Sequence, residues 1–305
     1  MKKSTRRLRL LSKEILDCQT VRTLSTTIES STRAEDRENV KSLLKWFEQF
    51  ESCIVAFSAG VDSSLVAWAA KSRLGDRAIA VTSISPAFAL SERIETSRIA
   101  KEIGVKLIEV RQDDMSDENY VRNDVRRCYF CRSNLVDAIK PIAEKYSIAV
   151  CVDGTHVDDV KSPRPGVKAL REAGFRAPLT ELGFGKAEIR EMAKRVGLSN
   201  WDRPSEACLS SRIAFGERID ADRLRKVELA EQIVASLTGA RIVRVRAIGT
   251  RASIEVDRDS VNTAKNVENA LGDSLKKLGF EVVAIDPEGY VSGKMLELYV
   301  QNERS

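Results

Sequence analysis

Short apolar runs alternate with amphipathic segments between residues 53 and 197. The runs "CIVAFS", "RAIAVTSIS", "VKLIEVR" and "IAVCVDGT" are typical of buried strands, whereas "DSSLVAWAAKSRL", "SERIETSRIAKEIG" and "GKAEIREMAKRVG" have helical spacing. This alternation predicts right-handed βαβ units and an α/β fold, in which helices cover both faces of a mainly parallel sheet. Ligands of such sheets bind at the carboxyl ends of the strands.

The pattern divides the chain into three parts. Residues 37–218 hold the alternating segments, and there "SNLVDAIKPIAEKYS" predicts a helix with a kink or break at Pro141. Residues 219–305 contain a long helix, the hairpin pattern "RIVRVRAIGTRASIEVD", a second helix and a last strand, which predict a smaller α+β domain. Residues 1–36, rich in Arg, Ser and Thr, predict a basic polar N-terminal arm.

The composition, with 43% hydrophobic and 31% charged residues, is that of a soluble globular protein. No apolar run approaches the roughly 20 residues that span a bilayer, and the basic start lacks the apolar region of a signal peptide. We therefore expect a cytoplasmic protein without membrane contact, whose six cysteines need no disulfides. The net charge of +5 permits anionic ligands without demanding nucleic acid.

A polar turn follows the first predicted strand and opens the next helix. Backbone N–H groups at such a turn bind anions, and small residues let phosphate oxygens approach closely. Asp62 could bind a Mg²⁺ ion shared with the phosphates. The turn lacks the Gly-Lys-Ser/Thr ending of a Walker A loop, and its alternative interpretation is a strand-to-helix turn capped by serines. The predicted nucleotide-binding residues here are Ser58, Ala59, Gly60, Val61, Asp62, Ser63 and Ser64.

Three cysteines lie in segments that suggest chemistry. Cys128 and Cys131 form a Cys-x-x-Cys pair, and Cys208 follows 77 positions later in a Pro- and Ser-rich stretch. Three thiolates suit an iron–sulfur cluster that leaves one iron open to an external sulfide. Structural zinc normally needs four ligands, and the sole histidine, His156, lies in another motif. Free thiols or a redox pair are the remaining alternatives, while Cys18, Cys53 and Cys151 fit core positions.

The polar turn resembles the PP-loop, Ser-Gly-Gly-Val-Asp-Ser, of the ATP pyrophosphatases, which cleave ATP between the α and β phosphates. Ala59 replaces the first glycine, which is harmless unless that residue needs a positive φ. The strings "AFSAGVDSSL", "RCYFCRSNL", "DGTHVDD", "RPGVKAL", "WDRPSEACLSSRIAFGERI" and "GYVSGKM" further resemble the LarE family, sulfur transferases of nickel-pincer nucleotide biosynthesis. The resemblance runs from about residue 37 to about 296 and implies an adenine nucleotide alpha-hydrolase-like fold.

The resemblance also implies a mechanism with ATP and Mg²⁺. A carboxylate of pyridinium-3,5-biscarboxylic acid mononucleotide is adenylated with release of pyrophosphate, and sulfur then converts it to a thiocarboxylate. One branch of the family sacrifices the sulfur of its Ala-Cys-Leu cysteine, whereas another carries sulfide on a 4Fe–4S cluster. With all three cysteines, this chain resembles the cluster branch, so Cys128, Cys131 and Cys208 are its expected ligands. Cys208, Asp62 and Ser63 are the expected catalytic residues, the sulfide source is open, and a homo-oligomer is implied.

Other residues carry over from the family by position. Thr82 and Ser83 resemble its adenine-contacting turn, and Arg164 lies in an Arg-Pro-Gly turn that reaches the nucleotide. Asp153, Gly154 and Thr155 resemble its Gly-Thr-Asn-x-Asp-Asp segment, with His156 in place of Asn. In residues 219–305, expected to bind substrate or form oligomers, two strand arginines suit a substrate phosphate together with an arginine near Cys208. These three are Arg244, Arg246 and Arg212, and a solvated strand face is the alternative for Arg244 and Arg246.

Two other functions remain open. A tRNA thiolase can also join a PP-loop to three cysteines, but it needs a broad basic surface, and here Lys and Arg are interleaved with acids. A non-catalytic nucleotide-binding protein would carry its cysteines incidentally and release no pyrophosphate.

Overall fold

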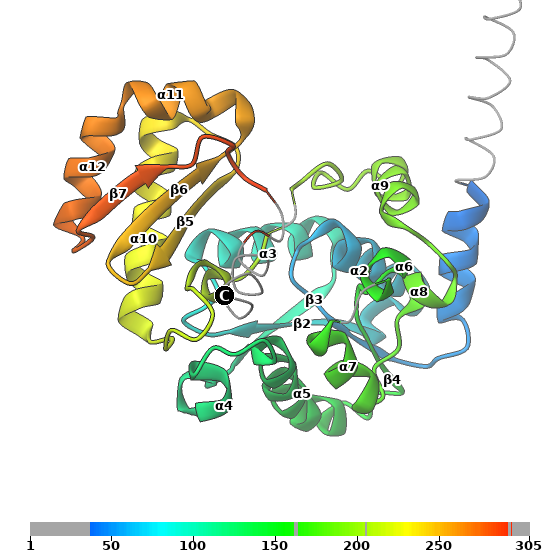
Figure 1. Ribbon diagram of the computed structural model, residues 1–305. Helices are drawn as coiled ribbons and strands as arrows, with labels where there is room; N and C mark the ends of the chain where they lie inside the picture. Colours follow the sequence, from blue (N-terminus) through cyan, green and yellow to red (C-terminus); the bar gives the residue numbers. More distant parts are fainter. Residues whose placement is uncertain (1–36, 162–163, 205, 292–293, 295–305) are drawn as a thin grey trace, which may run out of the picture.

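The computed structural model describes residues 37–161, 164–204, 206–291 and 294 (Figure 1). The arm predicted at residues 1–36, with Cys18, lies outside these residues. Four parallel strands form the larger sheet in the order β3-β2-β1-β4. They are β1 (Cys53–Ala56), β2 (Ala78–Ile84), β3 (Lys106–Arg111) and β4 (Val150–Val152). The all-parallel sheet and its flanking helices confirm the predicted α/β fold class.

Helices cover both faces of this sheet (Figure 1). Cys53 and Val55 of β1 belong to a core that also contains side chains of α2 and α9, whereas Ile54 packs with side chains of α5 and α7. This division follows from the strand period of two, which sends successive side chains to opposite faces. The main helices are α2 (Val61–Leu74), α3 (Leu90–Ile103), α5 (Arg127–Lys145), α7 (Pro165–Glu172) and α9 (Lys186–Arg195).

Helix α5 continues through Pro141, so the predicted break is absent. The proline removes one N–H donor from this 19-residue helix, and the packing of Leu135, Val136 and Ile139 against the sheet outweighs that loss. Residues 37–47 are also helical. Short helices fill the connections: α4 (Glu118–Val121), α6 (Val157–Val160), α8 (Pro178–Glu181) and the 3₁₀ turns η1 (Gly75–Arg77), η2 (Asp114–Ser116), η3 (Leu209–Arg212) and η4 (Arg258–Ser260).

The second sheet has three strands in the order β5-β6-β7. The predicted hairpin joins β5 and β6 in antiparallel register, and β7 pairs parallel to β6. The elements are α10 (Ala221–Thr238), β5 (Val243–Ile248), β6 (Arg251–Val256), α11 (Val261–Asn266), α12 (Glu268–Lys277) and β7 (Val282–Ile285). Asp220 caps α10, because its side chain accepts the Arg223 N–H at 2.8 Å.

Segments of the first part contribute to the core of the second. Tyr120, Val121 and Leu209 pack with side chains of α10, β5 and β6. The backbone joins the two parts as well, since the Ile219 N–H donates to the Val121 carbonyl at 2.8 Å. Side chains from both sides of residue 218 therefore share one core, and the domain boundary near this residue stays a prediction. Within the described ranges, no helix has the length and apolar character to span a bilayer.

Candidate active site

The polar turn connects β1 to α2 at the carboxyl edge of the larger sheet. Gly60 is the N-cap of α2, with φ −68° and ψ 154° and no side-chain cap. The Ser63 hydroxyl donates to the Gly60 carbonyl at 3.1 Å and lies 3.3 Å from the Ser58 hydroxyl. Val61 is the first residue of α2, so the N–H groups of its first turn have no partner within the helix. This geometry is suited to an anion.

Ala59 adopts a left-handed conformation, with φ 54°, and is fully buried. An L-residue other than glycine pays about 1–2 kcal/mol for that region. The PP-loop motif has a glycine at this position, and Ala59 does adopt the positive φ that glycine would reach without strain. Asn200 supports it from outside the loop: its Nδ2 donates to the Ala59 carbonyl at 2.8 Å and to the Ser64 hydroxyl at 2.9 Å. Ser64 consequently faces the interior.

Asp62 forms an ion pair with Lys186, a residue that no sequence motif indicated. Lys186 Nζ lies 2.7 Å from each carboxylate oxygen of Asp62. Lys186 is the first residue of α9, and its backbone N–H donates to Asp158 Oδ2 at 2.9 Å. Asp158 thus contacts the backbone of Lys186, whereas Asp62 contacts its ammonium group. A carboxylate at a phosphate-binding loop suits Mg²⁺, which Asp62 would hold together with phosphate oxygens.

The ends of β2 and β4 lie beside the loop. Thr82 is buried, and its hydroxyl donates to the Phe57 carbonyl at 2.7 Å, while Ser83 next to it is half-buried. After β4, Gly154 passes so close to the loop that an added Cβ would lie 2.8 Å from Ser63 N. Gly154 is therefore required for close backbone approach.

The segment after Gly154 forms its own polar network. Asp153 pairs with Arg171 of α7, and its other oxygen accepts the Thr155 N–H at 2.8 Å. Arg164 Nη1 lies 2.5 Å from Asp159, whose other oxygen lies 3.4 Å from His156 Nε2. Arg164 is thus joined to the segment that follows β4.

The three cysteines come from two segments that meet. Cys128 and Cys131 lie on the first turns of α5, and Cys208 directly precedes η3. Arg127 Nη1 donates to the Ser210 carbonyl at 2.9 Å, which holds the Cys208 segment against the start of α5. Cys128 and Cys208 are exposed, and Cys131 is half-buried.

Electrostatics also link the thiols. The pKa of Cys131 is raised to about 12, chiefly by burial; the charge of Arg132 lowers it, and the Asp114 carboxylate and the neighbouring Cys208 and Cys128 raise it. Over the described ranges, no three His, Cys, Asp or Glu side chains form a group that could hold one metal ion. A 4Fe–4S cluster binds each cysteine to a different iron, so its ligands need not converge on a point. Three thiols are the donors that such a cluster takes, and the cluster itself stays a prediction.

The three arginines assigned to a substrate phosphate are buried among carboxylates. Arg212 contacts Glu231 through Nε at 2.8 Å and Nη2 at 3.1 Å, and its Nη1 donates to the Ala207 and Cys208 carbonyls. Arg246 Nε and Nη2 both bond to Glu255 Oε2, at 3.0 and 2.8 Å.

Arg244 Nη2 lies 2.7 Å from Glu206. Burial lowers the pKa of Arg244, and the charge of Arg212 lowers it further. Their role toward substrate stays a prediction, and an arriving anion would compete with these carboxylates. The acidic partners Glu206 and Glu255 carried no signal in the sequence beyond their charge.

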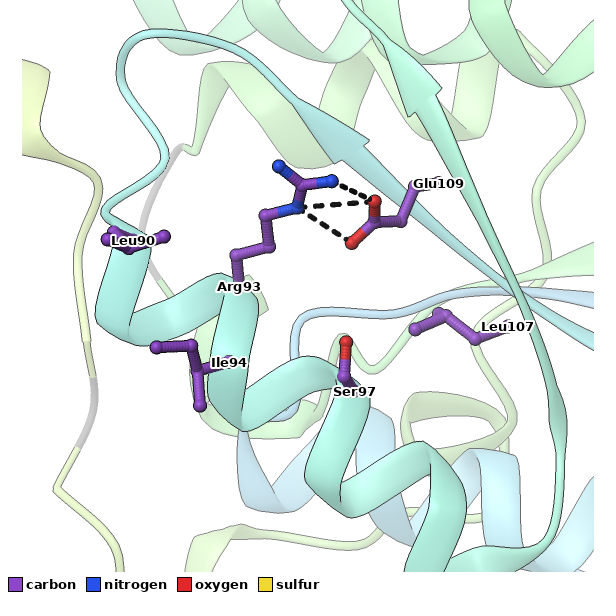
Figure 2. Close-up of a pocket in the computed structure, with 6 residues that line it drawn as sticks. All are labelled: Leu90, Arg93, Ile94, Ser97, Leu107 and Glu109. Atoms are coloured by element: carbon purple, nitrogen blue, oxygen red, sulfur yellow. Dashed lines mark hydrogen bonds and ion pairs between the residues drawn. The ribbon is translucent and has the colours of Figure 1, made fainter.

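A separate groove of about 720 Å³ lies between α3 and β3 (Figure 2). The Arg93 guanidinium pairs with Glu109 across it, and Leu90 and Ile94 line it from α3. None of the predicted site residues lines this groove, so it is distinct from the loop and from the cysteines.

Three relatives match most of the chain. An uncharacterized protein of Synechocystis sp. is 36% identical over 259 residues, which cover 84% of this chain and 96% of the relative. The pyridinium-3,5-bisthiocarboxylic acid mononucleotide synthase of Lactiplantibacillus plantarum is 31% identical over 83% of this chain and 92% of its own length. An uncharacterized protein of Methanocaldococcus jannaschii is 28% identical over 83% of this chain. No protein-family model matches. At this identity and coverage, the chain belongs to the LarE family.

Proposed function

We propose that this protein is an ATP-dependent sulfur transferase that builds a thiocarboxylate on a pyridinium mononucleotide. The relative from Lactiplantibacillus plantarum is named for synthesis of the bisthiocarboxylic acid mononucleotide. The observation that carries the proposal is the contact of Arg127 Nη1 with the Ser210 carbonyl at 2.9 Å. It joins Cys208 to the Cys128–Cys131 pair in a chain that also carries an anion-binding loop.

The first half of the proposed reaction consumes ATP. The loop and the first turn of α2 bind the phosphates, and Asp62 would hold the Mg²⁺ that offsets their charge. A carboxylate oxygen of pyridinium-3,5-biscarboxylic acid mononucleotide attacks the α-phosphorus, and the bond to the β-phosphate breaks, releasing pyrophosphate. The Ser63 hydroxyl, which lies on the loop beside Ser58, turns from the Gly60 carbonyl to donate to the leaving group.

The second half transfers sulfur. When bound, a 4Fe–4S cluster supplies the sulfide that replaces AMP on the acyl carbon. Cys128, Cys131 and Cys208 would hold that cluster, and Arg127, which contacts the Cys208 segment, would offset negative charge there. The exposure of Cys128 and Cys208 leaves this side open to substrate. Arg244 and Arg212 offer guanidinium groups to the substrate phosphate.

Iron counting and product analysis test the proposal together. Anaerobically purified protein should carry about four irons per chain, and Cys208→Ala should lose most of them. Cys151→Ala, which removes a thiol from β4, is the matched control and should keep its iron. With ATP, sulfide and pyridinium-3,5-biscarboxylic acid mononucleotide, the wild-type protein should release AMP and pyrophosphate in equal amounts as the thiocarboxylate forms.

Two results would overturn parts of this proposal. If mass spectrometry after turnover finds that Cys208 has lost the elements of H₂S, the cysteine is a sacrificial donor and the cluster role falls. If no AMP or pyrophosphate forms with this substrate, the assigned reaction is wrong. A salt-sensitive gel shift with tRNA, together with tRNA-dependent AMP formation, would establish the thiolase alternative instead.

A further inference from the structure

Asn200 is a buried side chain attached to the loop from a distant part of the chain. Only 3% of it is exposed, and it lies 141 positions from Ala59. Its Nδ2 uses both hydrogens within the loop, at the Ala59 carbonyl and the Ser64 hydroxyl. Both N–H donors of the side-chain amide therefore bond to the loop. The proposed reaction itself gives Asn200 no role.

The Ala59 bond determines where the next N–H group points. The Ala59 carbonyl and the Gly60 N–H belong to one planar trans peptide, so they point in opposite directions. With the carbonyl directed to Asn200 at 2.8 Å, the Gly60 N–H faces the Ser58 hydroxyl, 3.5 Å away on the open side of the loop. Rotation of this peptide would remove one donor from the anion site.

The conformation at Ala59 makes such support necessary. A φ of 54° is costly for alanine and free for glycine, so an unsupported alanine favours rotation out of this region. A fixed acceptor bond to Asn200 opposes that rotation.

Asn200 is itself held from the other side. Its neighbour Ser199 donates through N to Glu102 Oε1 at 2.8 Å and through its hydroxyl to Glu102 Oε2 at 2.5 Å. The backbone carbonyl of Asn200 accepts the backbone N–H of Arg203 at 3.1 Å. The side chain is thus a fixed support, because both its backbone and its amide are anchored.

We infer that Asn200 is a positioning residue that holds the left-handed Ala59 and thereby aims the Gly60 N–H at the phosphates of ATP. In this chain the hydrogen bond from Asn200 stabilises a left-handed conformation at Ala59 that a glycine would adopt without support. The inference rests on the proposed nucleotide site for its functional consequence, but the Ala59–Asn200 coupling is independent of any ligand.

The test is a double-mutant cycle on Asn200 and Ala59. Binding of α,β-methylene-ATP is measured by calorimetry for wild type, Asn200→Ala, Ala59→Gly and the double variant. Asn200→Ala should weaken binding about five- to tenfold, the value of one lost hydrogen bond. Ala59→Gly alone should change binding less than about twofold, and in the glycine background the loss from Asn200→Ala should fall to about twofold. Thr238→Ala, which removes a side-chain hydrogen bond to the Val234 carbonyl within α10 and contacts no loop residue, is the control.

The same four proteins are unfolded in urea without nucleotide. Ala59→Gly should raise the unfolding midpoint more in the Asn200→Ala background than in wild type, because glycine replaces the missing support. Asn200→Leu, which keeps volume but cannot donate, serves if the alanine variant does not fold. Equal losses from Asn200→Ala in both backgrounds would overturn the inference. If wild type binds no nucleotide, the proposed function fails, and the urea cycle still decides whether Asn200 supports Ala59.

Discussion

The ammonium group of Lys186 lies 2.7 Å from both carboxylate oxygens of Asp62, 124 positions earlier in the chain. The pair joins the loop after β1 to the start of α9. Both side chains are partly exposed, at 32% and 23%, so incoming phosphates can reach them. The ammonium group therefore balances the one carboxylate of the loop at the place where the phosphates are proposed to bind.

Lys186→Met should weaken ATP binding about tenfold or more, since it removes a cation beside the phosphates and leaves the Asp62 charge to repel them. The measurement is calorimetric binding of α,β-methylene-ATP in the presence of Mg²⁺. Lys71→Met is the matched control, because Lys71 makes an equivalent 2.7 Å pair with Asp76 at the opposite end of α2. Equal affinities for the two variants would contradict a phosphate role for Lys186.

Gly154→Ala should damage both stability and nucleotide binding. The new Cβ would lie 2.8 Å from Ser63 N and 3.1 Å from Ser63 Cα, so the backbone of the loop must move. We expect a loss of about 1–3 kcal/mol in the free energy of unfolding, as for overpacked cores. Gly272→Ala on α12 meets nothing within 4 Å, and it should stabilise by up to about 1 kcal/mol through helix propensity. Urea unfolding compares the two, and an unaffected Gly154→Ala would show that the loop is free to shift.

Glu231→Gln should be strongly destabilising. It removes the charge that balances Arg212, and the Glu206 carboxylate, 4.0 Å from Arg212 Nη2, is too distant for a hydrogen bond. Because Arg212 is only 2% exposed, we expect a loss of about 3 kcal/mol in the free energy of unfolding. Glu118→Gln, in an exposed pair with Arg218, should leave the stability nearly unchanged. Similar losses for both variants would mean that the Arg212 charge is balanced by other groups.

Much of the architecture was predictable, because its signals are local. Apolar runs and helical spacing predicted the strands and main helices, since each periodicity is set by the geometry of one element. The hairpin at Gly249 followed from turn chemistry, and that glycine indeed has a φ of 55°. The helix through Pro141 was the exception, because the packing of α5 against the sheet outweighs the hydrogen bond lost at the proline, and no local pattern shows that packing.

The partners within the site were not predictable from one sequence. Asn200 and Lys186 contact the loop across more than a hundred positions, and neither residue carries a pattern that indicates its partner. The left-handed conformation of Ala59 was also hidden, because alanine is compatible with most turns. The loop and the cysteine pair could be singled out because their spacing alone suggests their chemistry.

Glu181 gives a prediction about pH. Its hydrogen bonds to Arg176 lower the pKa of the carboxyl group from 4.5, and the bond from Trp46 Nε1 at 2.9 Å contributes as well. A carboxyl whose pKa is lower in the folded state stabilises the fold above its unfolded pKa, and that stability disappears as the pH falls through the folded value. Glu181→Gln should therefore lower the free energy of unfolding at pH 7 by less than about 1 kcal/mol, since the pair is partly exposed.

The difference between Glu181→Gln and wild type should shrink as the pH falls below about 4.5, because both proteins then carry an uncharged group at this position. Urea unfolding at several pH values between about 7 and 3 measures it. Glu191→Gln, on the exposed surface of α9, controls for the loss of one negative charge and should show a smaller difference at pH 7. A difference that stays constant into the acid range would attribute the effect to side-chain packing against Trp46, because packing does not depend on the ionisation of the carboxyl group.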